Sequence, residues 1–148
     1  MKILLAVDDS EYSTAAVNEV AKRPWPGSST VKILKVVEPL PLGVEPWVGG
    51  SEGLDELDTE LKKRANSLIK KTIERLKKND LKVQSVIRHG SAASKIVEEA
   101  ESWAADLIVV GSHGYSAIER LFLGSVAMSV VSHAPCSVEV VRSKKGKS

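Results

Sequence analysis

Cysteine, aromatic residues and long apolar runs are all scarce in this sequence of 148 residues. The single cysteine, Cys136, excludes an intramolecular disulfide and leaves no cysteine cluster for zinc. No apolar run approaches the roughly 20 residues that a membrane-spanning helix needs. The opening MKILLAV is interrupted at once by Asp8 and Asp9, so we expect a first strand there rather than a signal peptide. We therefore expect a cytoplasmic protein that does not associate with membranes.

A strong charge of one sign is also lacking, because the net charge is only +2. Aromatic residues make up 4% of the chain and do not alternate with basic patches, so no nucleic-acid partner is expected. Much of the positive excess lies in the tail at Lys144, Lys145 and Lys147, which we expect to be solvated. The length fits one globular domain. We assign a single domain to residues 1–142 and a disordered basic tail to residues 143–148.

Short runs rich in Val, Ile and Leu alternate with longer amphipathic segments. Such runs are typical of strands buried on both faces of a parallel sheet. We expect five strands, at Lys2–Val7, Val31–Val37, Val83–Arg88, Asp106–Val110 and Ser137–Arg142. We expect helices from a Ser10 cap to about Lys22, over Leu54–Lys78, from a Ser91 cap, and from Gly124-Ser125 to just before Pro135. Strand–helix–strand repetition predicts one doubly wound, Rossmann-like α/β domain with helices on both faces of the sheet.

Polar residues and glycines gather where the predicted strands end. Asp8–Ser10 follows the first strand, His89-Gly90 the third, and Gly111–Gly114 the fourth. In an open parallel sheet, ligands bind beyond the carboxyl ends of the strands. We expect the site at this edge, with His133 and Cys136 at the opposite edge. A small buried thiol is then the expected state of Cys136, rather than a nucleophile.

The insertion Pro39–Gly53, which is rich in Gly and Pro, is the one long irregular loop in this scheme. Long loops of this kind often carry function, so we interpret it as a flap over the ligand. Trp47 is the one tryptophan that we expect near a ligand. Trp25 and Trp103 are expected to be packing anchors.

Residues 111–126 read GSHGYSAIERLFLGSV, in which Gly124-Ser125 opens a helix. Glycines let backbone amides approach a phosphate because no Cβ intervenes. A helix N-terminus adds free N–H groups and a partial positive charge. The structural alternative is a tight strand exit at Gly111 and Gly114 and a plain helix start at Gly124. The complete spacing, directly after a buried strand, favours a phosphate site.

The pattern G-x2-G-x9-G-S, with Val7-Asp8-x-Ser10 closing the first strand, resembles the ATP-binding branch of the universal stress protein family. LFLGSVA and APCSVEVVR extend the resemblance over nearly the whole chain. It implies a five-stranded sheet of order 3-2-1-4-5 and a homodimer through strand 137–142. It also implies binding of ATP or another adenine nucleotide, with Mg²⁺ or Mn²⁺ bridging the phosphates. The implied role is stress response or signalling, with at most weak ATPase activity.

The resemblance also implies site residues: Ala6, Val7, Asp8, Val36, Gly111, His113, Gly114, Gly124, Ser125 and Val126. Ala6 and the Val36 backbone would meet adenine, Asp8 the adenosine portion and Gly111 the ribose. Gly114 would lie against the phosphates. Gly124, Ser125 and Val126 would bind phosphate through backbone amides and the Ser125 hydroxyl.

Charged and titratable residues near these positions leave alternatives open. His113 and Arg120 would offset phosphate charge, although His113 equally suits a hydrogen bond that stabilises the turn and Arg120 a solvated surface position. Asp9 departs from the family pattern. It opposes a polyanionic ligand unless it points to solvent or joins the metal.

Two other functions compete with this interpretation. A hydrolase would use Ser10 with His113, but there is no G-x-S-x-G elbow and Ser10 is already expected to cap a helix. A nucleotide-independent dimeric interaction module would use the edge strand around Val138–Val141, which a monomer leaves unpaired. No lysine of a P-loop motif is present, so fast phosphoryl transfer is not expected.

Overall fold

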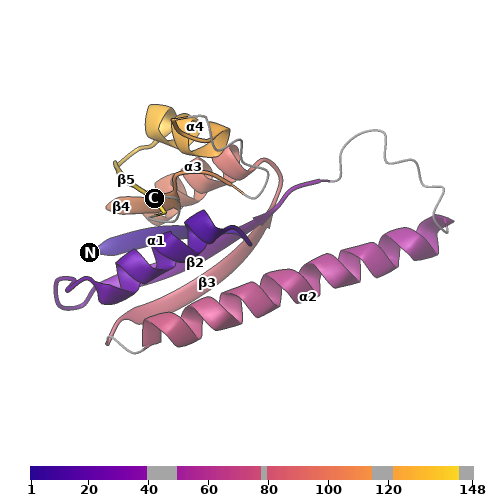
Figure 1. Ribbon diagram of the computed structural model, residues 1–148, viewed down its shortest axis with the longest axis horizontal. Coiled ribbons are helices and arrows are strands. Elements are labelled where there is room, and N and C mark those ends of the chain that lie inside the picture. The colour runs from indigo at the N-terminus through magenta and orange to yellow at the C-terminus, as the bar shows by residue number, and fades with distance from the viewer. Residues whose placement is uncertain (40–49, 78–79, 115–121, 144–148) are drawn as a thin grey trace, which may run out of the picture.

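The computed structural model describes residues 1–39, 50–77, 80–114 and 122–143, and for residues 50–54 only the backbone. The elements in these ranges are, in chain order, β1 (Lys2–Val7), α1 (Glu11–Lys22), β2 (Thr30–Val37), α2 (Gly50–Leu76), β3 (Lys82–His89), α3 (Ala92–Trp103), β4 (Leu107–Gly111), α4 (Ser125–His133) and β5 (Ser137–Val141). The strands form one five-stranded sheet of order β3-β2-β1-β4-β5 (Figure 1). Every neighbouring pair is parallel. The predicted fold class and strand order are confirmed.

Helices cover both faces of the sheet, and each face has its own core. Ile3 and Leu5 of β1 pack in one cluster with residues of α1 and α2. Leu4, between them, packs in the other cluster with residues of α3 and α4. All three side chains are fully buried. The period of two along β1 therefore divides an almost continuous apolar run between two cores, as a doubly covered parallel sheet requires.

The first helix begins and ends close to where the sequence predicts. The Ser10 Oγ accepts the N–H of Ser13 at 3.1 Å, which is an N-cap bond.

Ser91 occupies the N-cap position of α3 but makes no side-chain cap bond, so the expected capping contact there is wrong. The first N–H of the helix, that of Ala92, donates to the Glu38 carboxylate at 3.1 Å. Glu38 follows β2, so this bond ties the start of α3 to the neighbouring strand.

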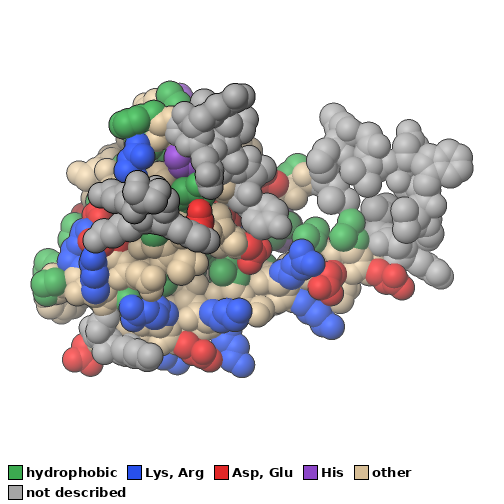
Figure 2. Space-filling view, in the orientation of Figure 1, with side chains coloured by type: hydrophobic (Ala, Val, Ile, Leu, Met, Phe, Trp, Pro, Cys, Tyr) green, Lys and Arg blue, Asp and Glu red, His purple; other side chains and the backbone are tan. Residues whose placement is uncertain are grey.

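Helix α2 is longer at its N-terminus than expected. It begins at Gly50 rather than Leu54, so the predicted loop Pro39–Gly53 is helical in its last four residues. Residues 40–49, which include Trp47, lie outside the described residues. Residues 55–60 are exposed, and the start of the helix runs past the sheet (Figure 1). Charged side chains of both signs cover this part of the surface (Figure 2).

β1 has the expected bounds, and the other strands differ from theirs by one residue at one or both ends. The clearest shift is in β4, which begins at Leu107 rather than Asp106 and includes Gly111. Asp106 contacts the start of β1 twice: its carboxylate accepts the backbone N–H of Lys2 at 2.7 Å, and its own N–H donates to the Lys2 carbonyl at 2.8 Å. No described helix is long and apolar enough to cross a membrane. The tail at 144–148 lies outside the described residues.

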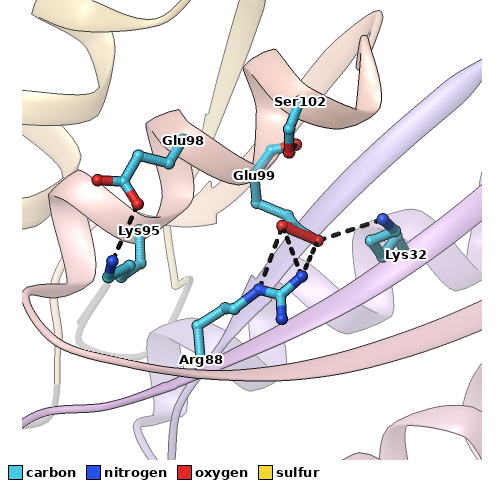
Figure 3. A network of polar contacts seen from close by, with 6 residues as sticks. All are labelled: Lys32, Arg88, Lys95, Glu98, Glu99 and Ser102. Carbon is cyan, nitrogen blue, oxygen red and sulfur yellow. Dashed lines mark hydrogen bonds and ion pairs between the residues drawn. The ribbon is translucent and has the colours of Figure 1, made fainter.

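A buried carboxylate fixes α3 to the sheet. Glu99 is 5% exposed and lies between Lys32 of β2 and Arg88 of β3, at 3.2 and 3.3 Å (Figure 3). The Lys32 ammonium also lies 4.6 Å from the ring centroid of Trp103. A buried charge is tolerated because its partners compensate for lost hydration. Glu99 therefore sets the position of α3, the helix that forms one wall of the site described below.

We expect Glu99→Ala to lower the free energy of unfolding by about 3 kcal/mol, because it leaves Lys32 desolvated without an anion. Glu98→Ala on the same helix removes a pair with Lys95 that is exposed to solvent, so it should cost less than about 1 kcal/mol. Urea unfolding of both variants measures the difference. Equal effects would contradict the role given to Glu99.

Candidate functional site

A cleft opens at the carboxyl edge of the sheet between β1 and β4. Strand order reverses here, because the chain adds β2 and β3 on one side of β1 and β4 and β5 on the other. Most of the predicted site residues line this cleft: Ala6, Val7, Asp8, Val36, Gly111, His113, Gly114 and Val126. Gly124 and Ser125 are not among the lining residues. Residues more than a hundred positions apart in the sequence, such as Asp8 and Gly114, therefore line one cleft, as the sequence predicted.

Asp8 follows β1, and hydrogen bonds hold it in place. Its Oδ1 accepts the N–H of Ser10 at 2.8 Å, and its own N–H donates to the Ser13 Oγ at 3.0 Å. Its Oδ2 faces Gly114, where an added Cβ would lie 3.5 Å away. Asp8 therefore presents a carboxylate oxygen beside the glycine turn. An ionised carboxylate only accepts hydrogen bonds, so this oxygen suits ligand hydroxyls.

Gly111 is required by packing against α1. A Cβ at this position would lie 2.8 Å from the backbone carbonyl carbon and oxygen of Tyr12, both of which belong to the helix backbone. Gly114 differs, because its nearest neighbour is the Asp8 side chain at ordinary contact distance. Gly111 therefore allows α1 to pack closely on β4, and Gly114 leaves space in the cleft.

Gly124 joins the start of α4 to the turn after β4. Its N–H donates to the Ser112 carbonyl at 2.7 Å, so this amide is already used and does not point at a ligand. The predicted role of the Gly124 amide as a phosphate donor is therefore wrong. A Cβ on Gly124 would come within 3.0 Å of the His113 Cα. Ser125 and Val126 follow as the first two residues of α4, where helix N–H groups lack intrahelical acceptors.

His113 lies in the wall of the cleft and is 8% exposed. Its Nδ1 is 3.0 Å from the Ser112 Oγ. Its ring lies 4.9 Å from that of Tyr12, with the planes tilted by 44°. These contacts orient the imidazole, so the turn-stabilising alternative is realised. Arg120 lies outside the described residues.

The sequence missed an apolar wall on the α3 and α4 side of the cleft. This wall consists of Leu34, Ala92, Ile96, Val110 and Ala127. Leu34 lies two residues before Val36 on β2, and Ala92 and Ile96 are four apart on α3. The two-residue repeat of a strand predicts that Leu34 and Val36 share a face, and the helical repeat predicts the same for Ala92 and Ile96. Only the packing of α3 on the sheet brings the two pairs together. Ser13 also lines the cleft.

The residues expected for a hydrolase do not assemble here. The Ser10 hydroxyl acts as the helix cap, and Ser10 does not line the cleft. His89 borders another groove, between the end of β3 and α2. Asp9 is exposed and borders a third groove, which α2 also lines. Its carboxylate therefore does not line the cleft where a polyanion would meet it.

Cys136 and His133 lie at the opposite edge of the sheet, as expected. Cys136 comes just before β5 and is partly buried against the α3 and α4 core. Burial raises the pKa of its thiol, and nearby Asp106 raises it further. The thiol is therefore protonated at neutral pH and is a poor nucleophile. The His133 Nδ1 lies 2.8 Å from the Ser129 carbonyl at the end of α4.

A doubly wound parallel sheet with a cleft at its switch point defines the class of α/β ligand-binding domains. Within that class, the model of the Universal stress protein family matches residues 1–142. The chain belongs to this family.

Individual relatives agree with this assignment. The chain is 35% identical over 146 residues to Universal stress protein MJ0531 of Methanocaldococcus jannaschii, with 97% of this chain and 83% of the relative covered. The solved structure of MJ0577 from the same organism superposes with a TM-score of 0.85 at 28% identity, covering 98% and 97% of the two chains. Universal stress protein UspA from Lactobacillus plantarum gives a TM-score of 0.80 at 26% identity, covering 96% and 97%.

The two glycines of the β4 turn should respond differently to substitution. We expect Gly111→Ala to lower the free energy of unfolding by about 1–3 kcal/mol, because its methyl group would press on the α1 backbone. Gly114→Ala should change it by less than about 0.5 kcal/mol, because the site has room. Thermal or urea unfolding of the ligand-free variants compares them. A larger loss for Gly114→Ala would refute this division of roles.

Proposed function

We propose that this protein binds ATP or another adenine nucleotide in the cleft between β1 and β4, as a member of the ATP-binding branch of its family. The observation that carries the proposal is the lining of the cleft, which combines an apolar wall, the fixed carboxylate of Asp8 and the first turn of α4 at Val126. These groups suit the adenine, the ribose and the phosphates of a nucleotide, respectively. The biological role that we infer is stress response or signalling.

The apolar wall suits an adenine ring. Leu34, Val36 and Ile96 contribute apolar side chains to the lining of the cleft, and a mainly apolar lining is usual for a small-molecule site. Val36 adds a backbone group. The N–H of Thr30 donates to Met1, so the backbone groups of even-numbered β2 residues face β1. Val36 lies one residue beyond the partner of Val7, so its carbonyl faces the space past the end of β1 and can accept from the adenine amino group.

The start of α4 suits the phosphates. The N–H groups of Ser125 and Val126 lie at the positive end of the helix dipole, where anions bind favourably. Gly114 leaves the approach open. The Ser125 hydroxyl is a further donor at the same end. In this proposal Gly124 supports these amides and does not bind the phosphate itself.

Solved structures with the same fold support the choice of ligand class. One is an Arabidopsis thaliana protein of this family with AMP bound, at 16% identity and a TM-score of 0.72. Another is a universal stress protein in complex with cAMP, at 24% identity and a TM-score of 0.67. These likenesses are of fold, so the argument for this chain rests on its own cleft.

A divalent ion fits this site only together with the nucleotide. Within the described ranges, no three His, Cys, Asp or Glu side chains are grouped to hold a metal. We infer that Mg²⁺ or Mn²⁺ would bind through phosphate oxygens. A fast phosphoryl transferase needs a positioned base and cationic clamps, so we propose slow hydrolysis at most.

The direct test is to denature the purified protein, identify any nucleotide released, and titrate the nucleotide-free protein with ATP by calorimetry. We expect Gly114→Ala to weaken ATP binding about tenfold, or 1.4 kcal/mol, because its methyl group fills the approach to the phosphates. Gly27→Ala is the matched control, since an added Cβ there meets nothing within 4 Å. Unchanged affinity in Gly114→Ala would refute the site, and the absence of ATP binding to the wild type would refute the function.

We also propose a homodimer formed through strand 137–142. β5 lies at the edge of the sheet. The Val141 carbonyl accepts the N–H of Ser112, so odd-numbered β5 residues face β4, and the backbone groups of Val138 and Val140 point outward. Exposed apolar side chains occur nearby, with Phe122 80%, Met128 58% and Val131 50% exposed. An unpaired edge beside apolar surface favours association.

Val140→Pro tests this interface. Proline removes only an outward N–H at this position, so the ladder with β4 should remain while a second chain loses its donor. We expect sedimentation to give a dimer for the wild type and a monomer for Val140→Pro, with circular dichroism unchanged. A wild-type monomer, or a variant that remains dimeric, would refute pairing through β5.

A further inference from the structure

The start of α4 is held by the segment that precedes it. Gly124 packs on the turn after β4 through its hydrogen bond to Ser112 and its close approach to His113. Phe122 lies two residues earlier, and its side chain is 80% exposed. Leu123, between Phe122 and Gly124, is partly buried against the α3 and α4 core. Core packing therefore holds Leu123, whereas the exposed Phe122 needs a surface contact to fix its position.

Arg142, directly after β5, makes that contact. Its Nη2 donates to the Phe122 carbonyl at 2.8 Å. Its guanidinium also lies 4.4 Å from the centroid of the Phe122 ring, within the range of a cation–π interaction. A planar guanidinium can make both contacts at once, which a lysine ammonium does less well. One side chain thus holds the backbone and the ring of the same residue.

The end of β5 also holds the turn after β4, on which Gly124 packs. The Val141 carbonyl accepts the N–H of Ser112 at 2.8 Å, and Ser112 in turn accepts the N–H of Gly124. Two consecutive residues of the edge strand therefore contact the β4 turn and the segment that leads into α4. Arg142 does not itself line the cleft.

We propose that Arg142 is a positioning residue that fixes the N-terminus of α4 at the phosphate end of the cleft. The inference rests on the proposed nucleotide function, and it adds a residue that contacts no ligand. Arg142 acts by holding Phe122, and through it Gly124, so that the amides of Ser125 and Val126 converge on one anion. The effect should therefore grow with the number of phosphates on the ligand.

The first experiment needs no ligand. Amide hydrogen exchange is measured by NMR on the full chain, for the wild type and for Arg142→Gln. We expect the Gly124 amide to exchange about two- to tenfold faster in the variant, which is the range of one net hydrogen bond. The Leu4 and Leu5 amides of β1 are the internal reference and should not change. Unchanged exchange at Gly124, or equal acceleration at β1, would overturn the proposal whether or not the protein binds nucleotides.

The second experiment measures binding of ATP and adenosine to the same proteins. Arg142→Gln should weaken ATP binding about two- to tenfold and leave adenosine binding within twofold. Arg75→Gln is the matched control, because it removes an equal charge from an exposed arginine that contacts Asn18 on α1. It should leave both affinities unchanged.

Ionic strength separates positioning from simple attraction between Arg142 and the phosphates. At 0.1 and 0.5 M salt a positioning effect should persist, whereas long-range attraction is screened. A loss that disappears at high salt, or one that is equal for ATP and adenosine, would overturn the proposal. If the wild type binds no ATP, the proposed nucleotide function is wrong. The exchange rate of the Gly124 amide still decides whether Arg142 fixes the segment that leads into α4.

Discussion

The site depends on backbone packing directly against backbone around the end of β4. Gly111 lies against the α1 backbone at Tyr12, and Gly124 lies against the turn at His113. A Cβ at Gly111 would lie 2.8 Å from the Tyr12 backbone, closer than real Cβ atoms approach, and a Cβ at Gly124 would lie 3.0 Å from the His113 Cα, so the neighbouring backbone would have to shift at either position. These two close approaches bring β4, α1 and α4 to one point. The fold thereby places a helix N-terminus beside the carboxyl end of β1 without a long side chain reaching across.

Charge around the cleft is distributed in keeping with this arrangement. The buried charges of Glu99 and its partners lie between α3 and strands β2 and β3, where they hold a wall in place. Among the described residues, the one carboxylate that lines the cleft is Asp8, and the backbone N–H of Ser10 holds it. In the proposed function, main-chain amides at the start of α4 supply attraction for an anion. Such a site is built for the shape and hydroxyl groups of a ligand as well as for its charge.

The sequence predicted the fold because the three central strands, β1, β2 and β4, are buried on both faces. Runs such as Ile3–Val7 leave few alternatives to a parallel sheet, and Ser10, Gly111 and Gly124 mark the ends of elements where the structure has them. It also located Asp8 and Gly114 in the cleft, because carboxyl ends of parallel strands meet at one edge.

Other features depended on tertiary contacts that local pattern does not contain. The apolar wall forms only when Ile96 of α3 packs over Leu34 of β2. The Ser91 hydroxyl makes no cap bond, and Glu38, distant in sequence, accepts the first N–H of α3. The Gly124 amide is used by Ser112, a pairing between segments whose closeness the spacing of glycines does not reveal. Polar groups with several nearby partners are where sequence reasoning was least accurate.

The edge strand β5 connects the edge proposed for dimerisation with the cleft. Its outward backbone groups, at Val138 and Val140, are available to another chain, while its inward face contacts the β4 turn through Val141. Arg142 then extends from the same strand to the segment before α4. A strand added to this edge would act on residues that also hold the phosphate end of the cleft. If the edge pairs and the cleft binds as proposed, association and nucleotide affinity must be linked, because each equilibrium then depends on the same short segment.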